Sequence, residues 1–278
     1  MSREAAVRIA DYGALPNLSG IDLASDIVFT WNGTTSGVRV PDAEWIAGRR
    51  KGLTICDATS AAFAQEIDWR KLDVATFSWQ KALGGEAQHG MLILSPRAVA
   101  RLETYRPAWP LPKLFRMTRD GKLNHELFEG STINTPSMLC VQDYLDALDW
   151  VESVGGVEGT IARSNANASV IADWVARTPW VEFLARAPET RSNTSPCLKI
   201  VAPEVAALPR DIREAFPRQI AALLDAEDVA KDIAAHRSSP AGLRIWTGAT
   251  VEQSDLEALT PWLDWGFAEA KRALAKAA

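Results

Sequence analysis

The strongest constraint on the fold of this chain is a pair of apolar runs that each end in a charged residue. The first run covers residues 53–56 and is followed by Asp57. The second covers residues 74–79 and is followed by Gln80 and Lys81, with the glycine pair Gly84–Gly85 two residues further on. Continuous apolar runs are typical of buried parallel strands. Ligands of an open α/β sheet lie beyond the carboxyl ends of such strands, so we expect Asp57 and Lys81 to share a site.

An aspartate and a lysine presented together suit one cofactor, pyridoxal 5′-phosphate (PLP). This cofactor requires a lysine for its Schiff base and an acid beside its pyridine nitrogen. The sequence therefore predicts that Lys81 carries PLP and that Asp57 pairs with the ring nitrogen. Each residue also has a simpler interpretation, because a lysine can start a surface helix and an aspartate at a strand end often only caps a turn.

Composition narrows the class of protein. The chain has 278 residues, of which 47% are hydrophobic, and a formal net charge of -5 that argues against a nucleic-acid partner. No apolar run is long enough to cross a bilayer and the first residues lack the apolar core of a signal peptide, so we expect a cytoplasmic protein without a membrane partner. Cys56, Cys140 and Cys197 are far apart and fit neither a metal site nor a disulfide framework, so we expect all three to be buried.

The chain divides into an N-terminal part rich in apolar strands and a C-terminal part that alternates strand and helix. We expect residues 1–150 to form a large domain and residues 151–278 a smaller one. Thr135 is the expected N-cap of a helix over residues 137–153, because Pro136 follows it. Other expected strands are 27–31 and 91–94, both buried, with 197–201 and 242–247; other expected helices are 42–50, 96–106, 157–177, 211–224 and 254–276.

Five short motifs occur in an order that resembles one family, the phosphoserine aminotransferases, which are fold-type I PLP enzymes. They are Trp31–Gly37, Asp57–Ser60, Ser78–Lys81, Asn134–Pro136, and His236–Arg237 followed by Gly242–Arg244. The resemblance extends from about Ile9 to Leu274. It implies an α/β fold with a mostly parallel sheet in the PLP-binding large domain and a smaller α/β C-terminal domain.

The resemblance also implies roles for individual residues. Lys81 would be the catalytic lysine, which binds PLP and then moves a proton at the substrate Cα. Thr34, Asp57 and Gln80 would contact the cofactor, and Asn134 and Thr135 would reach the cofactor phosphate of a second subunit, so a homodimer is expected. Arg244 would bind the substrate α-carboxylate, and His236 and Arg237 the substrate phosphate or the distal carboxylate of glutamate. The implied reaction is amino transfer between glutamate and 3-phosphohydroxypyruvate, a step of serine biosynthesis.

The sequence departs from that family at its N-terminal end. Residues 1–26 contain no small-residue loop to hold a cofactor phosphate, so the large domain is expected to be partial, with exposed apolar sheet edges. Two alternatives therefore stay open. Besides a phosphoserine aminotransferase, the chain could be a non-catalytic or incomplete fragment of such an enzyme, or another fold-type I enzyme such as an alanine–glyoxylate aminotransferase or a cysteine desulfurase. A desulfurase needs a mobile nucleophilic cysteine, for which Cys197 is the candidate.

Overall fold

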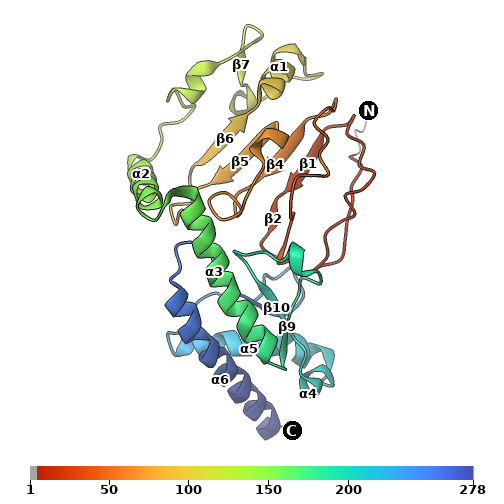
Figure 1. The fold of residues 1–278 in the computed structure, drawn as a ribbon, viewed down its shortest axis with the longest axis vertical. Coiled ribbons are helices and arrows are strands. Elements are labelled where there is room, and N and C mark those ends of the chain that lie inside the picture. Colours follow the sequence, from red (N-terminus) through yellow and green to blue (C-terminus); the bar gives the residue numbers. More distant parts are fainter. Residues whose placement is uncertain (1–4, 278) are drawn as a thin grey trace.

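A computed structural model describes residues 5–277, which form two lobes connected by one long helix (Figure 1). The upper lobe holds a four-stranded sheet in the order β1-β4-β5-β6. Its strands are β1 (Ile27–Thr30), β4 (Thr54–Asp57), β5 (Val74–Ser78) and β6 (Gly90–Leu94). The first three are parallel and β6 runs antiparallel to β5. This arrangement confirms the predicted mostly parallel sheet.

Two strands of this sheet, β1 and β6, were predicted to be buried but are partly exposed. Residues 91–94 form an antiparallel edge strand, in which Ile93 is 45% exposed, because β6 pairs with β5 alone among the described strands. Val28 in β1 is 77% exposed, while its neighbour Phe29 packs against the buried cluster around Trp31. Adjacent side chains of a strand point to opposite faces, so Val28 lies on the face opposite that cluster.

Short turns and hairpins surround the sheet. The predicted helix over residues 42–50 is wrong, because the segment forms turns instead. The Asp42 side chain accepts a 2.9 Å hydrogen bond from the Glu44 amide, a local bond that competes with helix formation. The remaining short elements of this lobe are β2 (Asn32–Gly33), β3 (Val38–Arg39), β7 (Thr118–Arg119), β8 (Lys122–Leu123) and the 3-10 turns Trp69–Lys71, Lys113–Phe115 and His125–Phe128.

Two helices belong to the upper lobe and its edge. Helix α1 (Pro96–Thr104) begins with proline and is capped by Ser95, whose side chain accepts a hydrogen bond from the Ala98 amide. Helix α2 (Met138–Ser153) is capped by Ser137. The predicted cap at Thr135 was therefore wrong by two positions, because the Ser137 hydroxyl, rather than that of Thr135, accepts from the Cys140 amide.

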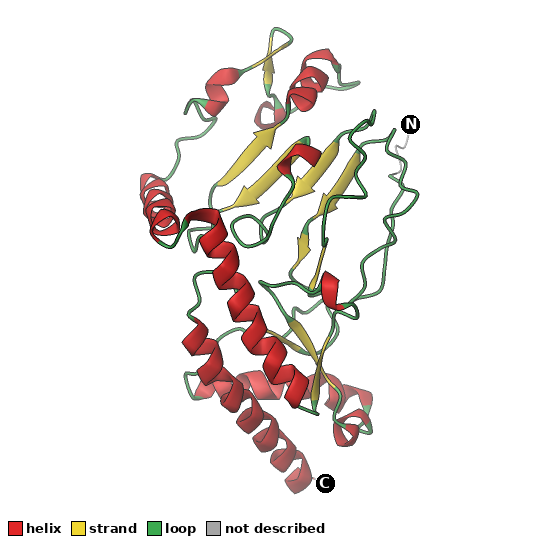
Figure 2. Ribbon diagram, viewed as in Figure 1, coloured by secondary structure: helices red, strands yellow, loops and turns green. Residues whose placement is uncertain are grey.

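The lower lobe combines a small antiparallel sheet with packed helices, which Figure 2 shows in yellow and red. The sheet has the order β11-β10-β9. The predicted strand over 242–247 is shortened to two residues. The elements are β9 (Val181–Phe183), β10 (Cys197–Ile200), β11 (Leu243–Arg244), α3 (Gly156–Arg177), α4 (Pro203–Ala206), α5 (Arg210–Ala226), α6 (Gln253–Ala277) and the 3-10 turn Pro188–Thr190.

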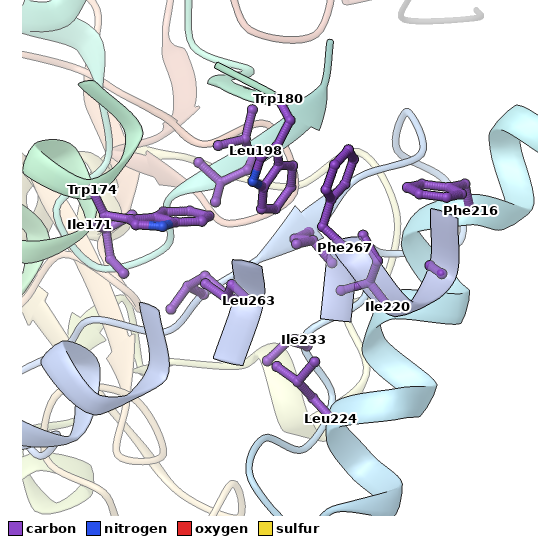
Figure 3. Packing of buried hydrophobic residues seen from close by; sticks show 14 of the residues in the cluster. Ile171, Trp174, Trp180, Leu198, Phe216, Ile220, Leu224, Ile233, Leu263 and Phe267 are labelled. Atoms are coloured by element: carbon purple, nitrogen blue, oxygen red, sulfur yellow. The ribbon is translucent and has the colours of Figure 1, made fainter. Parts of the chain in front are cut away.

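A large apolar core holds the lower lobe together (Figure 3). The Trp180 and Phe267 rings stack at 4.4 Å, and Leu263 is fully buried between the helices and the sheet. Burying each such side chain stabilises the fold by about 1.5–3 kcal/mol. All three cysteines are buried and unpaired, as predicted. Among the described helices none combines the length and apolarity of a membrane span.

Candidate active site

A cavity of about 290 Å³ lies where the two lobes meet. The upper lobe contributes three residues that the sequence singled out, Thr34, Gln80 and Lys81. From the lower lobe come Ser195, Lys231, Asp232, Ile233, Arg244 and Trp246. Four of the predicted site residues therefore share one cavity, although Arg244 is far from the others in the sequence. We call this the interlobe cavity.

Lys81 stands on a tight turn that follows β5. Backbone hydrogen bonds of 3.0 Å from Gly84 to the Lys81 carbonyl and from Gly85 to the Trp79 carbonyl close the turn. Gly84 has a φ of +66°, a conformation that side chains disfavour, which explains the glycine there. Trp79 anchors the turn, because its buried indole stacks on the Tyr144 ring at 4.1 Å.

The Lys81 ammonium has no ion-pair partner within residues 5–277, and it lies 5.6 Å from the centre of the Trp246 ring. An amine without an acidic partner is available to react with a carbonyl group. Beside it, the buried Oε1 atom of Gln80 lacks a hydrogen-bond partner in the described part of the chain. Within the described chain, the wall of the cavity therefore carries a lysine without an ion-pair partner next to an amide oxygen without a hydrogen-bond partner.

Thr34 belongs to the β2–β3 hairpin, which the lower lobe holds in place. Its carbonyl accepts a 3.1 Å hydrogen bond from the Ser195 hydroxyl and lies 3.6 Å from the Cys197 thiol. Gly37, with a φ of +67°, lets the hairpin approach, because a Cβ there would lie 2.9 Å from the Cys197 Cβ. The position of Thr34 thus depends on contacts between the lobes.

A buried polar network joins the same two segments. The Asn32 amide nitrogen donates to the Ser60 and Thr194 hydroxyls at 2.8 and 3.1 Å. The Gln65 amide nitrogen donates to Asn32 Oδ1 and to Asn193 Oδ1, at 3.0 and 2.8 Å. Hydrogen bonds in a low-dielectric interior fix orientation strongly, so this network sets how the upper lobe sits on the lower one. Asn32 therefore has a structural role at the base of the Thr34 hairpin.

Two cations of the interlobe cavity, Lys231 and Arg244, differ in their ion-pair partners. Lys231 pairs with Asp225 at 2.7 Å and with Asp228 at 2.9 Å. Arg244 pairs with Asp232 at 3.3 Å, through Nη2. Because Lys231 already has two carboxylate partners and Arg244 has one exposed partner, Arg244 is the better candidate to bind an incoming carboxylate.

Asp57 lies at the carboxyl end of β4 but does not line the interlobe cavity. It is exposed, and its Oδ1 accepts hydrogen bonds from the backbone amide and the hydroxyl of Thr59, at 2.9 and 2.6 Å. The turn-capping interpretation of Asp57 therefore describes its contacts in this structure. Its register neighbours in the sheet are Thr30 and Thr76, on the more exposed face.

Asn134 and Thr135 lie outside the interlobe cavity as well. Both are exposed in the segment that leads to α2. Large apolar side chains flank this segment on both sides: Leu114, Phe115 and Phe128 precede it, and Met138 and Leu139 follow it, each at least 46% exposed. We call these five residues the apolar flanks.

His236 and Arg237 line a second cavity, of about 340 Å³, at the tip of the hairpin that ends in β11. The two cavities have no lining residue in common. The His236 Nδ1 lies 2.7 Å from the Ser238 hydroxyl. Helix α5 adds Arg210 and Arg218 to this second cavity, so it is strongly cationic, although Glu214 pairs with Arg210.

Sequence reasoning missed Ser195, Asp232 and Trp246 as cavity residues. Ser195 and Asp232 stand in no recognisable motif, and a tryptophan two residues after Arg244 reads as a core residue. Their roles come from the packing of the lobes, which brings the β11 region to the turn of Lys81. Local sequence signals for such residues are weak because the contacts are long-range.

No protein-family model matches the chain. The phosphoserine aminotransferase of Methanosarcina mazei is 55% identical over 258 residues, which cover 93% of this chain and 67% of that protein. A phosphoserine aminotransferase from Cytophaga hutchinsonii has a similar structure, with a TM-score of 0.74 at 20% identity, over 92% of this chain and 68% of that one.

A third similar protein is the PLP-bound phosphoserine aminotransferase of Trichomonas vaginalis. Its TM-score is 0.67 at 15% identity, and the match covers 93% of this chain and 68% of that one. At such low identity the two solved structures establish the fold, which is the predicted fold-type I architecture.

Proposed function

Because the chain belongs to the phosphoserine aminotransferase family, we propose that it transfers an amino group between glutamate and 3-phosphohydroxypyruvate. The products are O-phosphoserine and 2-oxoglutarate, so the reaction is a step of serine biosynthesis. One observation carries the proposal: Lys81, Gln80, Thr34 and Arg244 meet in the interlobe cavity. An amine and a carboxylate-binding guanidinium are the two groups that amino transfer to an oxo acid requires.

The residues of the interlobe cavity fit the aldehyde end of PLP. Lys81 offers an amine without an acidic partner, and the buried Gln80 amide has an unsatisfied atom at the same wall. PLP, when bound, supplies an electron sink for the substrate Cα. Asp57 at the end of the neighbouring strand is the proposed partner of the ring nitrogen, and Thr34 and Gln80 are proposed further contacts of the cofactor.

The residues of the two cavities then have distinct proposed roles in the reaction. Arg244 holds the substrate α-carboxylate, preferably by two parallel N–H bonds. The Lys81 amine, within the same cavity, accepts the proton that leaves the Cα of glutamate, and in the second half-reaction it delivers a proton to the Cα of O-phosphoserine. His236 and Arg237 are proposed to hold the phosphate or the distal carboxylate, with Arg210 and Arg218 adding positive charge nearby.

A cytoplasmic homodimer is the proposed setting. The apolar flanks on either side of Asn134 and Thr135 support the dimer, because exposed apolar groups of this size mark interaction surfaces. In this assembly Asn134 and Thr135 of each subunit reach the cofactor phosphate of the other.

The environment of Cys197 argues against a cysteine desulfurase. Burial raises the pKa of the Cys197 thiol to about 11, although Arg244 lowers it in part. The side chain is also enclosed between the Thr34 and Ser195 carbonyls, each 3.6 Å from Sγ. A buried protonated thiol is a poor nucleophile.

Titration of the purified chain with PLP tests the proposal. A visible absorbance band that saturates with PLP is expected for the unmodified chain and should be lost in Lys81→Ala. The matched control is Lys199→Ala, because Lys199 is an exposed lysine paired with Glu182 on the lower lobe and should retain the band.

Three outcomes separate the alternatives. A band that survives Lys81→Ala would refute the lysine assignment. Absence of saturable binding to the unmodified chain would favour the incomplete-fragment alternative. Amino transfer from glutamate to 3-phosphohydroxypyruvate, measured beside glyoxylate as acceptor and beside sulfide release from cysteine, then identifies the reaction among the fold-type I enzymes.

A further inference from the structure

We propose that Asp232 is a competing carboxylate that occupies Arg244 until a substrate carboxylate displaces it, and so sets the affinity of the site for oxo acids. The inference rests on the proposed function, because it takes Arg244 as the substrate-binding arginine. It assigns a specificity role to a residue that no sequence motif marks. Asp232 and Arg244 both line the interlobe cavity.

The geometry places the Asp232 carboxylate where a substrate carboxylate would bind. Its Oδ2 atom lies 3.3 Å from Arg244 Nη2. The contact is single, whereas a guanidinium binds carboxylates best through two parallel hydrogen bonds. The Asp232 side chain is 89% exposed, while that of Arg244 is only 24% exposed. Asp232 therefore approaches a half-buried arginine from the solvent side of the cavity.

The other described cations of the cavity do not pair with Asp232, so a substrate carboxylate competes with Asp232 for Arg244. Lys231 is held by Asp225 and Asp228 and, among the described residues, forms no ion pair with Asp232. Lys81, the remaining cation of the cavity, contacts the Trp246 ring. An incoming carboxylate that binds Arg244 thus has to replace one acid, Asp232, and no other described carboxylate pairs with this guanidinium.

The backbone supplies a conservative test variant. Asp232 has a φ of +52°, in the left-handed region that Asn tolerates as well as Asp. Asp232→Asn should therefore keep the turn and remove the charge. Asp228 has a φ of +58°, is exposed, and pairs with Lys231 instead of Arg244. Asp228→Asn removes the same charge from the same turn region, so it is a matched control for the general electrostatic effect.

The experiment measures binding of 2-oxoglutarate by titration calorimetry to four forms of the full chain: unmodified, Asp232→Asn, Asp228→Asn and Arg244→Gln. Exposed ion pairs are weak, so releasing Arg244 should tighten binding by about two- to fivefold in Asp232→Asn. Asp228→Asn should bind as the unmodified chain does, and Arg244→Gln should lose most of the binding. In the transfer assay Asp232→Asn should lower the KM for the oxo acid relative to Asp228→Asn.

The results distinguish the inference from the function on which it rests. Equal or weaker binding in Asp232→Asn than in Asp228→Asn, with binding lost in Arg244→Gln, overturns the role of Asp232 and leaves the carboxylate site intact. Unchanged binding in Arg244→Gln overturns the assignment of Arg244 itself. No saturable binding to either the unmodified chain or Asp232→Asn overturns both.

Discussion

The Ser195 hydroxyl donates a 3.1 Å hydrogen bond to the Thr34 carbonyl, and this bond joins residues 161 positions apart. Ser195 is buried, so water cannot replace the bond without a change in packing. The contact ties a hairpin of the upper lobe to the strand that begins at Cys197 in the lower one. The shape of the interlobe cavity therefore depends on how firmly the lobes are held together.

Removal of this hydroxyl should loosen the Thr34 hairpin. We expect Ser195→Ala to lower the free energy of unfolding by about 1 kcal/mol, the net worth of a typical buried hydrogen bond. The apparent Kd for PLP should rise at the same time, because Thr34 is then held less firmly. Urea denaturation and PLP titration measure the two effects. Ser153→Ala, at an exposed serine on α2, serves as the control. Unchanged PLP affinity in Ser195→Ala would contradict this account.

Gly37 and Gly20 form a matched pair for testing the close approach of the hairpin. Both have positive φ, +67° and +65°, but only at Gly37 would an added Cβ meet another residue, Cys197. Alanine in the left-handed region costs about 1–2 kcal/mol at either position. Overpacking adds a further penalty of about 1–3 kcal/mol in Gly37→Ala. Thermal or urea unfolding of the two variants measures the difference. Equal destabilisation of the two variants would show that the hairpin accommodates the added Cβ without an overpacking penalty.

Asp73 should make the stability of the upper lobe sensitive to acid. Burial by itself would raise the pKa of Asp73, but hydrogen bonds from the Thr54 amide, the Ser95 hydroxyl and Arg50 lower it below its ordinary value. The Asp73 and Arg50 side chains are 3% and 4% exposed and lie 2.7 Å apart.

A depressed folded-state pKa stabilises the fold above the unfolded value, about 3.9 for aspartate, and this contribution is lost as the pH falls through the folded value. Asp73→Asn leaves the buried Arg50 without its charge partner, so we expect a loss of about 3–5 kcal/mol at pH 7. The variant should also lose less stability than the unmodified chain on acidification to pH 3. Asp11→Asn, at an exposed pair with Arg186, should change stability by less than about 1 kcal/mol.

The buried cysteines should be unreactive in the folded protein. With a pKa of about 11 for Cys197, only about 0.1% of its thiol is ionised at pH 8. Burial, with the nearby Asp57 charge, also raises the pKa of Cys56, to about 12. We expect a coloured disulfide reagent at pH 8 to label no cysteine of the native chain and all three in denaturant. Rapid labelling of Cys197 in the native state would reopen the desulfurase alternative.

Much of the upper lobe was predictable because its signals are local. The apolar run over residues 74–79 forms β5, which ends one residue earlier at Ser78, and Gly84 and Gly85 close the turn that presents Lys81. The helix expected over residues 96–106 begins at Pro96, as α1 does. By contrast, the segment at 42–50 carries a helical pattern, yet the Asp42 turn and the packing of Ile46 decide its shape.

The sequence by itself determined the strand ends that present Asp57 and Lys81, the existence of the long helices, and the burial of the cysteines. These features follow from hydrophobic periodicity and short-range backbone chemistry. The tertiary structure alone decided that Arg244, Asp232 and Ser195 join Lys81 in the interlobe cavity, and that His236 and Arg237 line another one. Contacts between the lobes arise from packing and from buried hydrogen bonds between residues far apart in the sequence. A local sequence pattern does not indicate such contacts.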